Sequence, residues 1–382
     1  MVNQSTKLAG HIDKGNFSIS KIPLLSEESS FYDYSFLAYK YSELDLNNFQ
    51  DLKKNWYKRA KELLPIFKNF KSLGEGLTPL IESKVYKNCF IKDEGCNPSG
   101  CFKDRESSIV LPFFIERGFK EFGIVSSGNA ALSASLYGSI YGLGVKCFIP
   151  KNTSEAKKKL IKLFGGDYEL SGDNYEECYH KFLELCEQNK KICNITPGVC
   201  SIRDQGDKLI AFEIFEEIGV PDYIIVPSAN GGLLFGIFNG FRELKLLGLS
   251  DKMPVMIAVQ IEGAAPLAEA FKQKKDFVIL DQDIDTKAEG LVAMESYCSP
   301  KAQLALSETD GFVVLVKNEM LKDAMKFALS EEGILPEWTS SAGFAALTNG
   351  YEDGVIKENR KVVLINTGSG MKEIDDISGA LA

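Results

Sequence analysis

Short apolar runs alternate with longer alanine-rich or amphipathic stretches from residue 118 onward. The first unit contains an apolar run at residues 121–125, a buried-helix pattern at 130–141 and a second apolar run at 145–149. Gly142 and Gly144 separate the helix from the second run. Two strands joined through a helix are typical of a parallel sheet, so this pattern predicts a parallel α/β unit.

The same alternation continues along the rest of the chain. We expect strands at residues 167–170, 191–195, 222–226, 254–259, 311–316 and 361–365. We expect helices at residues 154–164, 174–188, 207–218, 231–246, 317–330 and 340–349. The predicted fold class is α/β, with two three-layer units in which helices cover both faces of a mostly parallel sheet, and a cleft between the units.

The first 75 residues lack this regularity and are rich in aromatic side chains. A cluster of them extends from Phe31 to Tyr41, and we interpret it as packing rather than as a recognition surface. We expect irregular structure in this part of the chain, followed by a helix over residues 47–67.

Composition and charge narrow the class of protein. A length of 382 residues corresponds to two or three domains, at about 150 residues for each domain. The apolar and charged fractions, 45% and 25%, are ordinary for a globular chain. The net charge is −9, from 44 basic and 53 acidic residues. Because there is no basic excess to neutralise phosphates, we do not expect nucleic-acid binding.

The number of histidines, the number and spacing of cysteines and the length of the apolar runs exclude further classes of protein. With two histidines, His11 and His180, neither a zinc site nor a histidine-based triad is expected. The nine cysteines are odd in number and form no C-x-x-C pair, which favours free thiols in a reducing compartment. No apolar run approaches a membrane span, and residues 1–14 hold no signal-peptide core. We therefore expect a cytoplasmic protein with no membrane partner.

Three loops that follow predicted strands carry small or polar residues. They are S-S-G-N at residues 126–129, P-S-A-N-G-G at 227–232 and N-T-G-S-G at 366–370. Ligands of open α/β sheets bind outside the carboxyl ends of the strands, where N–H groups at helix starts can hold an anion. From these residues alone, helix capping or a tight turn explains the first two loops equally well, and a simple turn explains the third better than a binding site does.

The segment K-D-E-G-C-N-P-S-G-C-F-K-D-R at residues 92–105 differs in kind. An N-P-S-G turn leads into Lys103, which follows Phe102. A lysine in a partly apolar site loses its proton readily and can act as a Schiff-base nucleophile. A surface lysine with Asp104 as its neighbour is the alternative interpretation of the same residues.

Together these segments resemble the fold-type II pyridoxal-phosphate enzymes, the tryptophan synthase β family, and within it threonine synthase. Residues 94–105 are similar to the signature E/D-x-x-N-P-[ST]-G-S-F-K-D-R, and residues 74–80 to the G-E-G-x-T-P-L of threonine synthases. Residues 126–129 resemble S-[ST]-G-N, residues 229–232 the cofactor-phosphate loop, and residues 367–372 the segment T-G-x-G-[LI]-K. The motifs occur in the family's order.

The resemblance implies a role for each motif. Lys103, next to Phe102, would bind pyridoxal 5'-phosphate (PLP) as a Schiff base and move a proton at Cα of the substrate. Asn129 would contact the ring oxygen of the cofactor, and Thr367 would face its pyridine nitrogen. The cofactor phosphate would be bound by the loop residues Ala229, Asn230, Gly231, Gly232 and Leu233. The substrate would be bound by Ser126, Ser127, Gly128, Ala130 and Arg203.

The resemblance also implies a domain organisation and an assembly. A large PLP-binding domain is expected from residues 1–103 and 208–382, with residues 1–70 as an N-terminal arm. A small α/β domain is expected from residues 104–207. The family further implies a homodimer that acts on a small amino-acid substrate.

Several residues depart from the threonine synthase pattern. The family segment N-S-x-N-P-x-R-x-x-G-x-K reads P-G-V-C-S-I-R-D-Q-G-D-K at residues 197–208, so Arg203 is present but the Asn-Ser pair is absent. Ala130 replaces a threonine, Leu233 an asparagine, Ala229 a glycine and Cys101 a serine. Each lost charge-assisted hydrogen bond costs about 1.5–3 kcal/mol, so we expect O-phosphohomoserine to bind poorly.

The sequence therefore predicts a PLP-dependent, threonine synthase-like enzyme for elimination or replacement on an amino acid with a β- or γ-leaving group. One alternative is a β-replacing or β-eliminating lyase of the cysteine synthase, cysteate synthase or serine/threonine dehydratase type. Another is a non-catalytic homologue, against which Lys103 argues because a decayed site has no need of that lysine. A nucleotide-binding protein without PLP would need a Walker A or Rossmann fingerprint, and neither is present.

Overall fold

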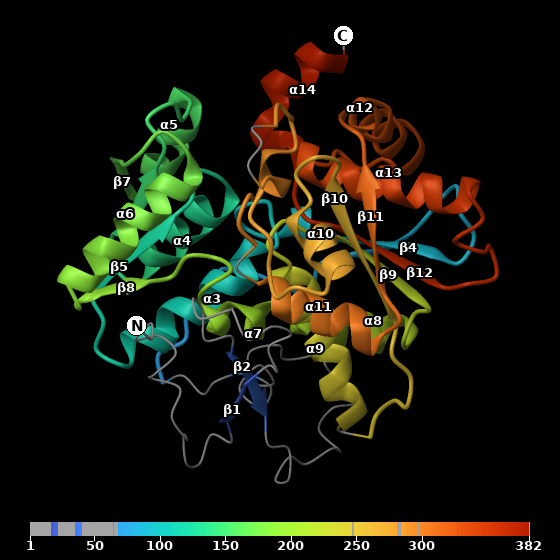
Figure 1. Cartoon of the computed structure of the whole chain (residues 1–382), viewed down its shortest axis with the longest axis horizontal. Helices are drawn as coiled ribbons and strands as arrows, with labels where there is room; N and C mark the ends of the chain where they lie inside the picture. The colour runs from blue at the N-terminus through green and yellow to red at the C-terminus, as the bar shows by residue number, and fades with distance from the viewer. Residues whose placement is uncertain are drawn as a thin grey trace.

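Two mostly parallel sheets organise the part of the chain that the computed structural model describes (Figure 1). The described residues are 17–21, 35–39, 64, 68–246, 248–280, 284–296 and 298–381. The larger sheet has six strands, in the spatial order β11 (Phe312–Val316), β10 (Val255–Ile261), β9 (Tyr223–Pro227), β12 (Val362–Asn366), β4 (Cys89–Asp93) and β3 (Leu80–Glu82). All its neighbouring strands are parallel except β3 and β4, which are antiparallel.

The smaller sheet has four strands, all parallel, that come from one continuous part of the chain. Its spatial order is β7 (Asp167–Leu170), β6 (Val145–Ile149), β5 (Glu121–Val125) and β8 (Ile192–Asn194). Three helices alternate with these strands: α4 (Asn129–Ile140), α5 (Glu155–Leu163) and α6 (Tyr175–Gln188). This is the expected parallel α/β unit. The domain borders at residues 104 and 207 stay a prediction.

Helices cover both faces of the larger sheet. On one face, the side chains of Val362 and Leu364 pack with α12 (Asn318–Phe327) and α13 (Trp338–Glu352). On the other face, Val363 and Ile365 pack in a second core with α8 (Leu209–Ile218), α9 (Gly232–Leu246) and α11 (Ser299–Glu308). Because side chains alternate along a strand, a strand buried on both faces reads as a continuous apolar run, as β12 does. The three-layer α/β class is confirmed.

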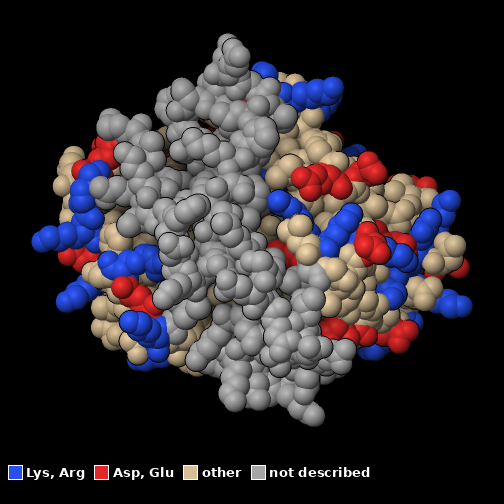
Figure 2. All heavy atoms as spheres, turned by 90° about the horizontal axis from the view of Figure 1, so that it is seen from below, with Lys and Arg blue, Asp and Glu red and all other residues tan. Residues whose placement is uncertain are grey.

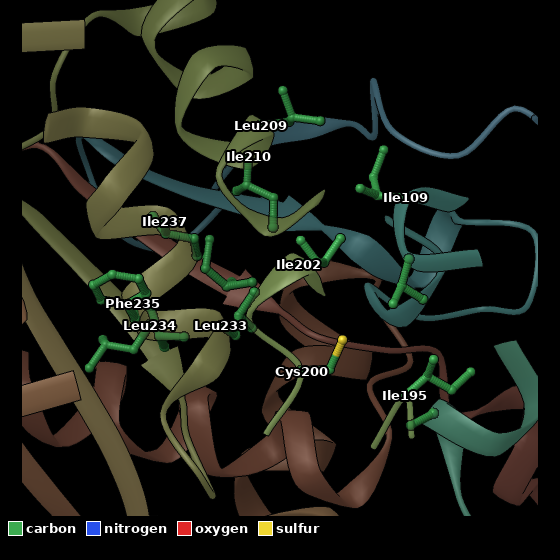
Figure 3. Packing of buried hydrophobic residues seen from close by; sticks show 14 of the residues in the cluster. Ile109, Ile195, Cys200, Ile202, Leu209, Ile210, Leu233, Leu234, Phe235 and Ile237 are labelled. Atoms are coloured by element: carbon green, nitrogen blue, oxygen red, sulfur yellow. The ribbon is translucent and has the colours of Figure 1, made fainter. Parts of the chain in front are cut away.

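The second of these cores extends to the smaller sheet. It also contains residues of β5, β6, α4 and α3 (Lys103–Ile115), together with η3 (Ser201–Arg203). Figure 3 shows part of it, with Cys200 and Ile202 of the η3 segment near Leu233 at the start of α9. The helix α3 therefore packs between elements of the two sheets, and its first residue, Lys103, lies where both meet.

The remaining elements are short. They are α7 (Asp204–Asp207), α10 (Pro266–Gln273), α14 (Ile374–Leu381), the 3-10 turns η2 (Glu94–Cys96), η4 (Glu289–Leu291) and η6 (Gly370–Glu373), and the π-turn η5 (Ala328–Glu332). All nine cysteines lie in described residues and are free thiols there. Among the described helices, none has both the length and the apolar character needed to span a bilayer. Acidic and basic side chains are intermixed on the described part of the face in Figure 2.

Three local predictions differ from the structure. The helix expected at 207–218 begins at Leu209 as α8, after the separate short helix α7, and the helix expected at 317–330 ends at Phe327 in a π-turn. The stretch expected to be irregular contains an antiparallel strand pair, β1 (Phe17–Lys21) and β2 (Ser35–Tyr39). None of β3, β4, α3, α10, α11 and α14 is predicted from the sequence. In α3, Pro112 interrupts the helical pattern. The helix expected at 47–67 lies outside the described residues, apart from Leu64.

Candidate active site

Lys103 is the first residue of α3, directly after the turn that ends β4. Its side chain is 17% exposed, and its Nζ lies 2.8 Å from Oε1 of Glu106, one helical turn further on. The same Nζ lies 4.2 Å from the ring centroid of Phe102. The lysine predicted from the sequence is thus an amino group with limited access to water, held between an aromatic ring and a buried carboxylate.

The segment with Thr367 joins the lysine segment through backbone hydrogen bonds. Thr367 follows β12, and its carbonyl oxygen accepts the N–H of Phe102 at 3.0 Å. The N–H of Ser369 donates to the carbonyl of Gly100 at 2.8 Å, and Nζ of Lys372 donates to the same carbonyl at 2.6 Å. Because β4 and β12 are parallel neighbours, their carboxyl ends lie at one edge of the sheet and bring these two motifs together.

The motif at residues 126–129 comes from the smaller sheet and reaches the same place. It connects β5 to α4, and Asn129 is the first residue of that helix. Nδ2 of Asn129 donates to Oε2 of Glu337 at 2.7 Å. Oγ1 of Thr367 lies 3.4 Å from the other oxygen of Glu337 and 2.6 Å from Oγ of Ser340. Glu337, which precedes α13, therefore connects Asn129 to Thr367.

The neighbouring residues of this loop are accessible. Ser126, Ser127 and Gly128 are half-buried, and Oγ of Ser126 accepts the N–H of Gly128 at 3.2 Å. Among the described residues, no atom lies within 4 Å of the position that a Cβ on Gly128 would take, so the backbone there has room beside it. Ala130 is buried, and its methyl group offers no hydrogen bond.

The loop at residues 229–233 lies between β9 and α9, at the carboxyl edge of the same sheet. Gly231 has a φ of +83°, and the helix begins at Gly232, one residue later than predicted. Within the described ranges, a Cβ on Gly232 would meet a single atom, the Sγ of Cys298 at 3.8 Å. The N-terminus of this helix therefore has room for an anion beside its free N–H groups.

The other residues of this loop are tied to the protein through their carbonyls. The carbonyl of Ala229 accepts from Gln260, and the carbonyl of Asn230 accepts from Ser296, both at 3.2 Å. The side chain of Leu233 lies in the core (Figure 3), so this residue can offer only its backbone to a ligand.

Arg203, predicted to contact the substrate, is buried and already paired. Its Nε lies 2.5 Å from Oε2 of Glu106, and its Nη1 donates to the carbonyl of Ile195 at 2.7 Å. The Nη2 atom is buried without a hydrogen-bond partner in the described residues. Arg203 and Lys103 therefore contact the same carboxylate, that of Glu106.

A buried network of ion pairs holds the segment at residues 92–105, which contains Lys103, in place. Arg105 donates to Glu94 at 2.6 Å and to Glu213 at 2.6 Å, and Lys92 lies 2.7 Å from Glu213. The Thr78 hydroxyl donates to Glu94 at 2.7 Å, which ties the segment at residues 74–80 to the same network. Burial alone would raise the pKa of Glu213, but Arg105 and Lys92 lower it to about 2.

Cys101, which replaces a serine of the signature, lies within this segment. It is fully buried, and its Sγ lies 3.4 Å from Oγ of Ser99. Burial raises the pKa of the Cys101 thiol to about 12, so the group is a neutral and weak donor.

These residues fit a planar, phosphorylated aldehyde cofactor. The Lys103 side chain is partly exposed, a helix N-terminus can hold a phosphate, and the backbone at Gly128 and Gly232 has room beside it. The pyridoxal-phosphate dependent enzyme family model matches residues 71–368. The chain belongs to this family. PLP is accordingly its cofactor, and the protein is a PLP-dependent enzyme of the lyase and synthase type.

Curated relatives of this family member include threonine synthases. The enzyme of Methanocaldococcus jannaschii is 31% identical over 90% of this chain and 86% of its own length. The enzyme of Mycobacterium bovis is 28% identical over 80% of this chain and 84% of its own. Both relations extend over most of each chain, so the likeness is not confined to the cofactor motifs.

Solved structures with the same fold include other PLP enzymes. Threonine deaminase isoform 2 from Solanum lycopersicum superposes with a TM-score of 0.68 at 24% identity, over 79% of this chain and 82% of its own. An L-serine ammonia-lyase from Rhizomucor miehei superposes with a TM-score of 0.70 at 21% identity, over 80% of this chain and 99% of its own. At these identities the two structures show that the chain has the same fold, and they show nothing further about it.

Sequence reasoning missed three acidic residues at this site: Glu106, Asp207 and Glu337. Glu106 follows Lys103 by three residues, a spacing that places both on one face of a helix, so recognising α3 would have revealed it. Asp207 and Glu337 approach the site only through tertiary contacts, and no local pattern indicates them.

Proposed function

We propose that the chain catalyses elimination or replacement of a leaving group at Cβ or Cγ of an amino acid, with the cofactor bound covalently to Lys103. The observation that carries the proposal is the meeting of Lys103, Thr367 and Asn129 at one sheet edge, linked by Glu337 and by the Phe102–Thr367 hydrogen bond. Three motifs far apart in sequence are thus connected to one another next to the segment that carries Lys103.

Each part of the site has a chemical task in this proposal. Lys103 removes the proton from Cα and returns it at a later step. The half-buried loop at residues 126–128 binds the substrate carboxylate through hydroxyl and backbone donors. The first N–H groups of α9 bind the cofactor phosphate. When bound, PLP supplies an electron sink for the pair left at Cα.

In this proposal the hydroxyl of Thr367, which contacts Ser340 and Glu337, would be the group offered to the ring nitrogen of the cofactor. A hydroxyl does not protonate that nitrogen as an aspartate would, so the electron sink is moderate. A moderate sink suits loss of a leaving group at Cβ or Cγ better than transamination.

The threonine synthase relatives favour O-phosphohomoserine as the substrate, whereas two features favour a substrate without a phosphate. Ala130 and Leu233 stand where hydrogen-bonding side chains were expected. Arg203 is engaged with Glu106 and with the carbonyl of Ile195. A dehydratase- or lyase-type reaction on a smaller hydroxy amino acid is therefore the second candidate.

The test is a visible absorption spectrum of the purified protein with PLP, recorded before and after adding O-phosphohomoserine, O-phosphoserine, serine or threonine. We expect a visible band that one of these amino acids shifts, together with release of its leaving group. Borohydride reduction followed by peptide mass spectrometry is expected to find the cofactor on Lys103.

Two variants control this test. Lys103→Ala is expected to lose the reducible band. Lys372→Ala is expected to retain it, since Lys372 is a neighbouring lysine that contacts the carbonyl of Gly100. A reducible band in Lys103→Ala would contradict the assignment of the lysine. Efficient turnover of O-phosphohomoserine would contradict the argument from the missing donors.

A further inference from the structure

The hydroxyl of Thr367 lies beside a second hydroxyl, that of Ser340 on α13. Oγ1 of Thr367 and Oγ of Ser340 are 2.6 Å apart. Thr367 is 1% exposed and Ser340 is fully buried, so water does not compete for this contact. The separation is at the short end of the range for O–H···O hydrogen bonds, so one of the two hydroxyl protons lies between the oxygen atoms. Which residue supplies that proton decides what the Thr367 hydroxyl can offer to a ligand.

The oxygen of Ser340 already accepts a proton from the backbone. The N–H of Gly368 donates to Oγ of Ser340 at 3.0 Å. A hydroxyl that accepts one hydrogen bond becomes a stronger donor, because successive hydrogen bonds polarise one another. The contact with Gly368 therefore favours Ser340 as the donor toward Thr367.

The other acceptor near the Ser340 hydroxyl is a poor one. The carbonyl oxygen of Gly368 lies 3.4 Å from Oγ of Ser340, beyond the ordinary length of an O–H···O hydrogen bond. The same carbonyl already accepts the N–H of Glu337 at 3.0 Å. Among the described residues, Oγ1 of Thr367 is therefore the acceptor that best suits the Ser340 proton.

The proton of Thr367 is then directed away from Ser340. The other acceptor beside it in the described part of the chain, Oε1 of Glu337, is 3.4 Å away and binds it only weakly. The backbone of Thr367 is fixed separately, since its carbonyl accepts the N–H of Phe102 at 3.0 Å. Thr367 thus holds a donor of which the protein itself makes little use, next to the segment that carries Lys103.

We propose that Ser340 is a positioning residue that fixes the Thr367 hydroxyl as a hydrogen-bond donor toward the ring nitrogen of the cofactor. The chain of hydrogen bonds extends from the N–H of Gly368 through the Ser340 hydroxyl to the Thr367 hydroxyl, and each proton stays on its own atom. The inference rests on the proposed function, because it deepens the role that Thr367 has there.

A fixed donor serves the chemistry of this site. A hydroxyl can rotate about its C–O bond and act as donor or as acceptor. An unprotonated pyridine nitrogen only accepts, so the hydroxyl beside it must be the donor. Because Ser340 donates to Thr367, it strengthens the donor strength of that hydroxyl without a proton transfer. Ser340 thereby adjusts the electron sink of the reaction without touching the cofactor.

The test observes the ring nitrogen directly and does not rely on turnover. The full chain is loaded with PLP that carries nitrogen-15 in the ring, and the chemical shift of this nitrogen is recorded by NMR. We expect Ser340→Ala to move the resonance toward that of a neutral pyridine nitrogen without a hydrogen bond, in the same direction as Thr367→Val. We also expect Ser340→Ala to weaken PLP binding about two- to tenfold, the effect of losing one neutral hydrogen bond.

The next residue of the same helix provides a matched control. Ser341 is also fully buried, but its hydroxyl donates to the carbonyl of Trp338 at 2.7 Å. Ser341→Ala is therefore expected to leave the resonance unchanged. Thr367→Ser keeps the hydroxyl and is expected to retain the wild-type resonance. If Ser340→Ala does not fold, Ser340→Cys decides, because a thiol fills the space but is a weak donor, and the same shift is expected.

The outcomes separate this inference from the proposed function. A resonance that moves in Thr367→Val but not in Ser340→Ala would overturn the role of Ser340 and leave Thr367 in its proposed place. A loss of stability in Ser340→Ala with an unchanged resonance has the same meaning, since it makes Ser340 a structural residue only. A resonance unchanged in Thr367→Val overturns the inference together with the placement of Thr367. Failure to fix the cofactor on Lys103 by borohydride overturns the proposed function itself.

Discussion

The carboxylate of Glu337 lies against the backbone of Gly368. A Cβ built on Gly368 would lie 2.6 Å from Oε1 and 2.8 Å from Oε2 of Glu337, closer than real Cβ atoms approach another atom. The same carboxylate accepts from Asn129 at 2.7 Å. The absence of a side chain at residue 368 therefore allows the contact between the two sheets at the active site.

Gly368→Ala is expected to weaken PLP binding at least about tenfold, which is roughly 1.4 kcal/mol. The new methyl group would displace Glu337 and with it the contact to Asn129. Spectroscopic titration of the protein with PLP measures the effect. Gly379→Ala in α14 is the matched control, because no atom of the described residues lies within 4 Å of its Cβ position. Equal affinities of the two variants would show that Glu337 does not need its present position.

Arg105→Leu is expected to destabilise the protein by about 3–5 kcal/mol, because it leaves Glu94 and Glu213 as buried carboxylates without this partner. Urea unfolding followed by circular dichroism measures the change. Arg360→Ala, which removes an exposed pair with Asp222 at 3.2 Å, is expected to cost less than about 1 kcal/mol. Similar losses in both variants would mean that the buried network contributes no more than a surface ion pair.

Glu373 is expected to make stability fall as the pH rises. Burial, and then the charge of Glu337, raise the pKa of Glu373 to about 7 from an ordinary value of 4.5. Between these values the folded chain binds a proton that the unfolded chain has released, so the contribution is complete below pH 4.5 and is lost as the pH rises through 7.

Glu373→Gln should remove this dependence, since glutamine can still accept the N–H of Trp338, which lies 3.1 Å from Oε2. Relative to wild type, we expect the variant to gain on the order of 1–2 kcal/mol at pH 8 and little at pH 5. Urea unfolding of both proteins at the two pH values checks this. A difference that does not change with pH would contradict it.

Gly231→Ala is expected to weaken the phosphate-binding loop. Gly231 has a φ of +83°, and its Cβ would lie 2.5 Å from the Cβ of Ala302. Strain of about 1–3 kcal/mol at this position should lower PLP affinity and stability together. Gly248 has a φ of +71° and, in the part of the chain that the structure describes, no neighbour within 4 Å of its Cβ position. Gly248→Ala therefore isolates the backbone effect in the same titration and unfolding assays. A loss of PLP affinity equal to that of Gly248→Ala would exclude the collision with Ala302 as the cause.

The sequence alone predicted the elements that are marked by a pattern within a few neighbouring residues. The bounds of β5, β6 and β7 match the prediction to the residue, because each is a short run flanked by glycine, proline or polar residues. It was insufficient for α3, where Pro112 and the preceding turn conceal the helix. Missing that helix also concealed the pairing of Lys103 with Glu106.

Motif resemblance located the loops of the site but not the contacts between them. The approach of Asp207 and Arg203 to Glu106 depends on close packing of the 204–207 segment on α3. A Cβ on Gly206 would lie 2.1 Å from the Arg105 carbonyl oxygen, which shows how close the two backbones come. Such a contact follows from the tertiary arrangement, and one sequence offers no spacing that predicts it.

The place of β12 in the larger sheet has a consequence for synthesis. This strand lies between β4 and β9, yet it is the last strand of the described chain to leave the ribosome. Until then β4 and β9 each present an unpaired edge, and the two halves of the sheet cannot join. Nascent chains that stop before residue 362 should therefore expose aggregation-prone strand edges until the central strand has been made.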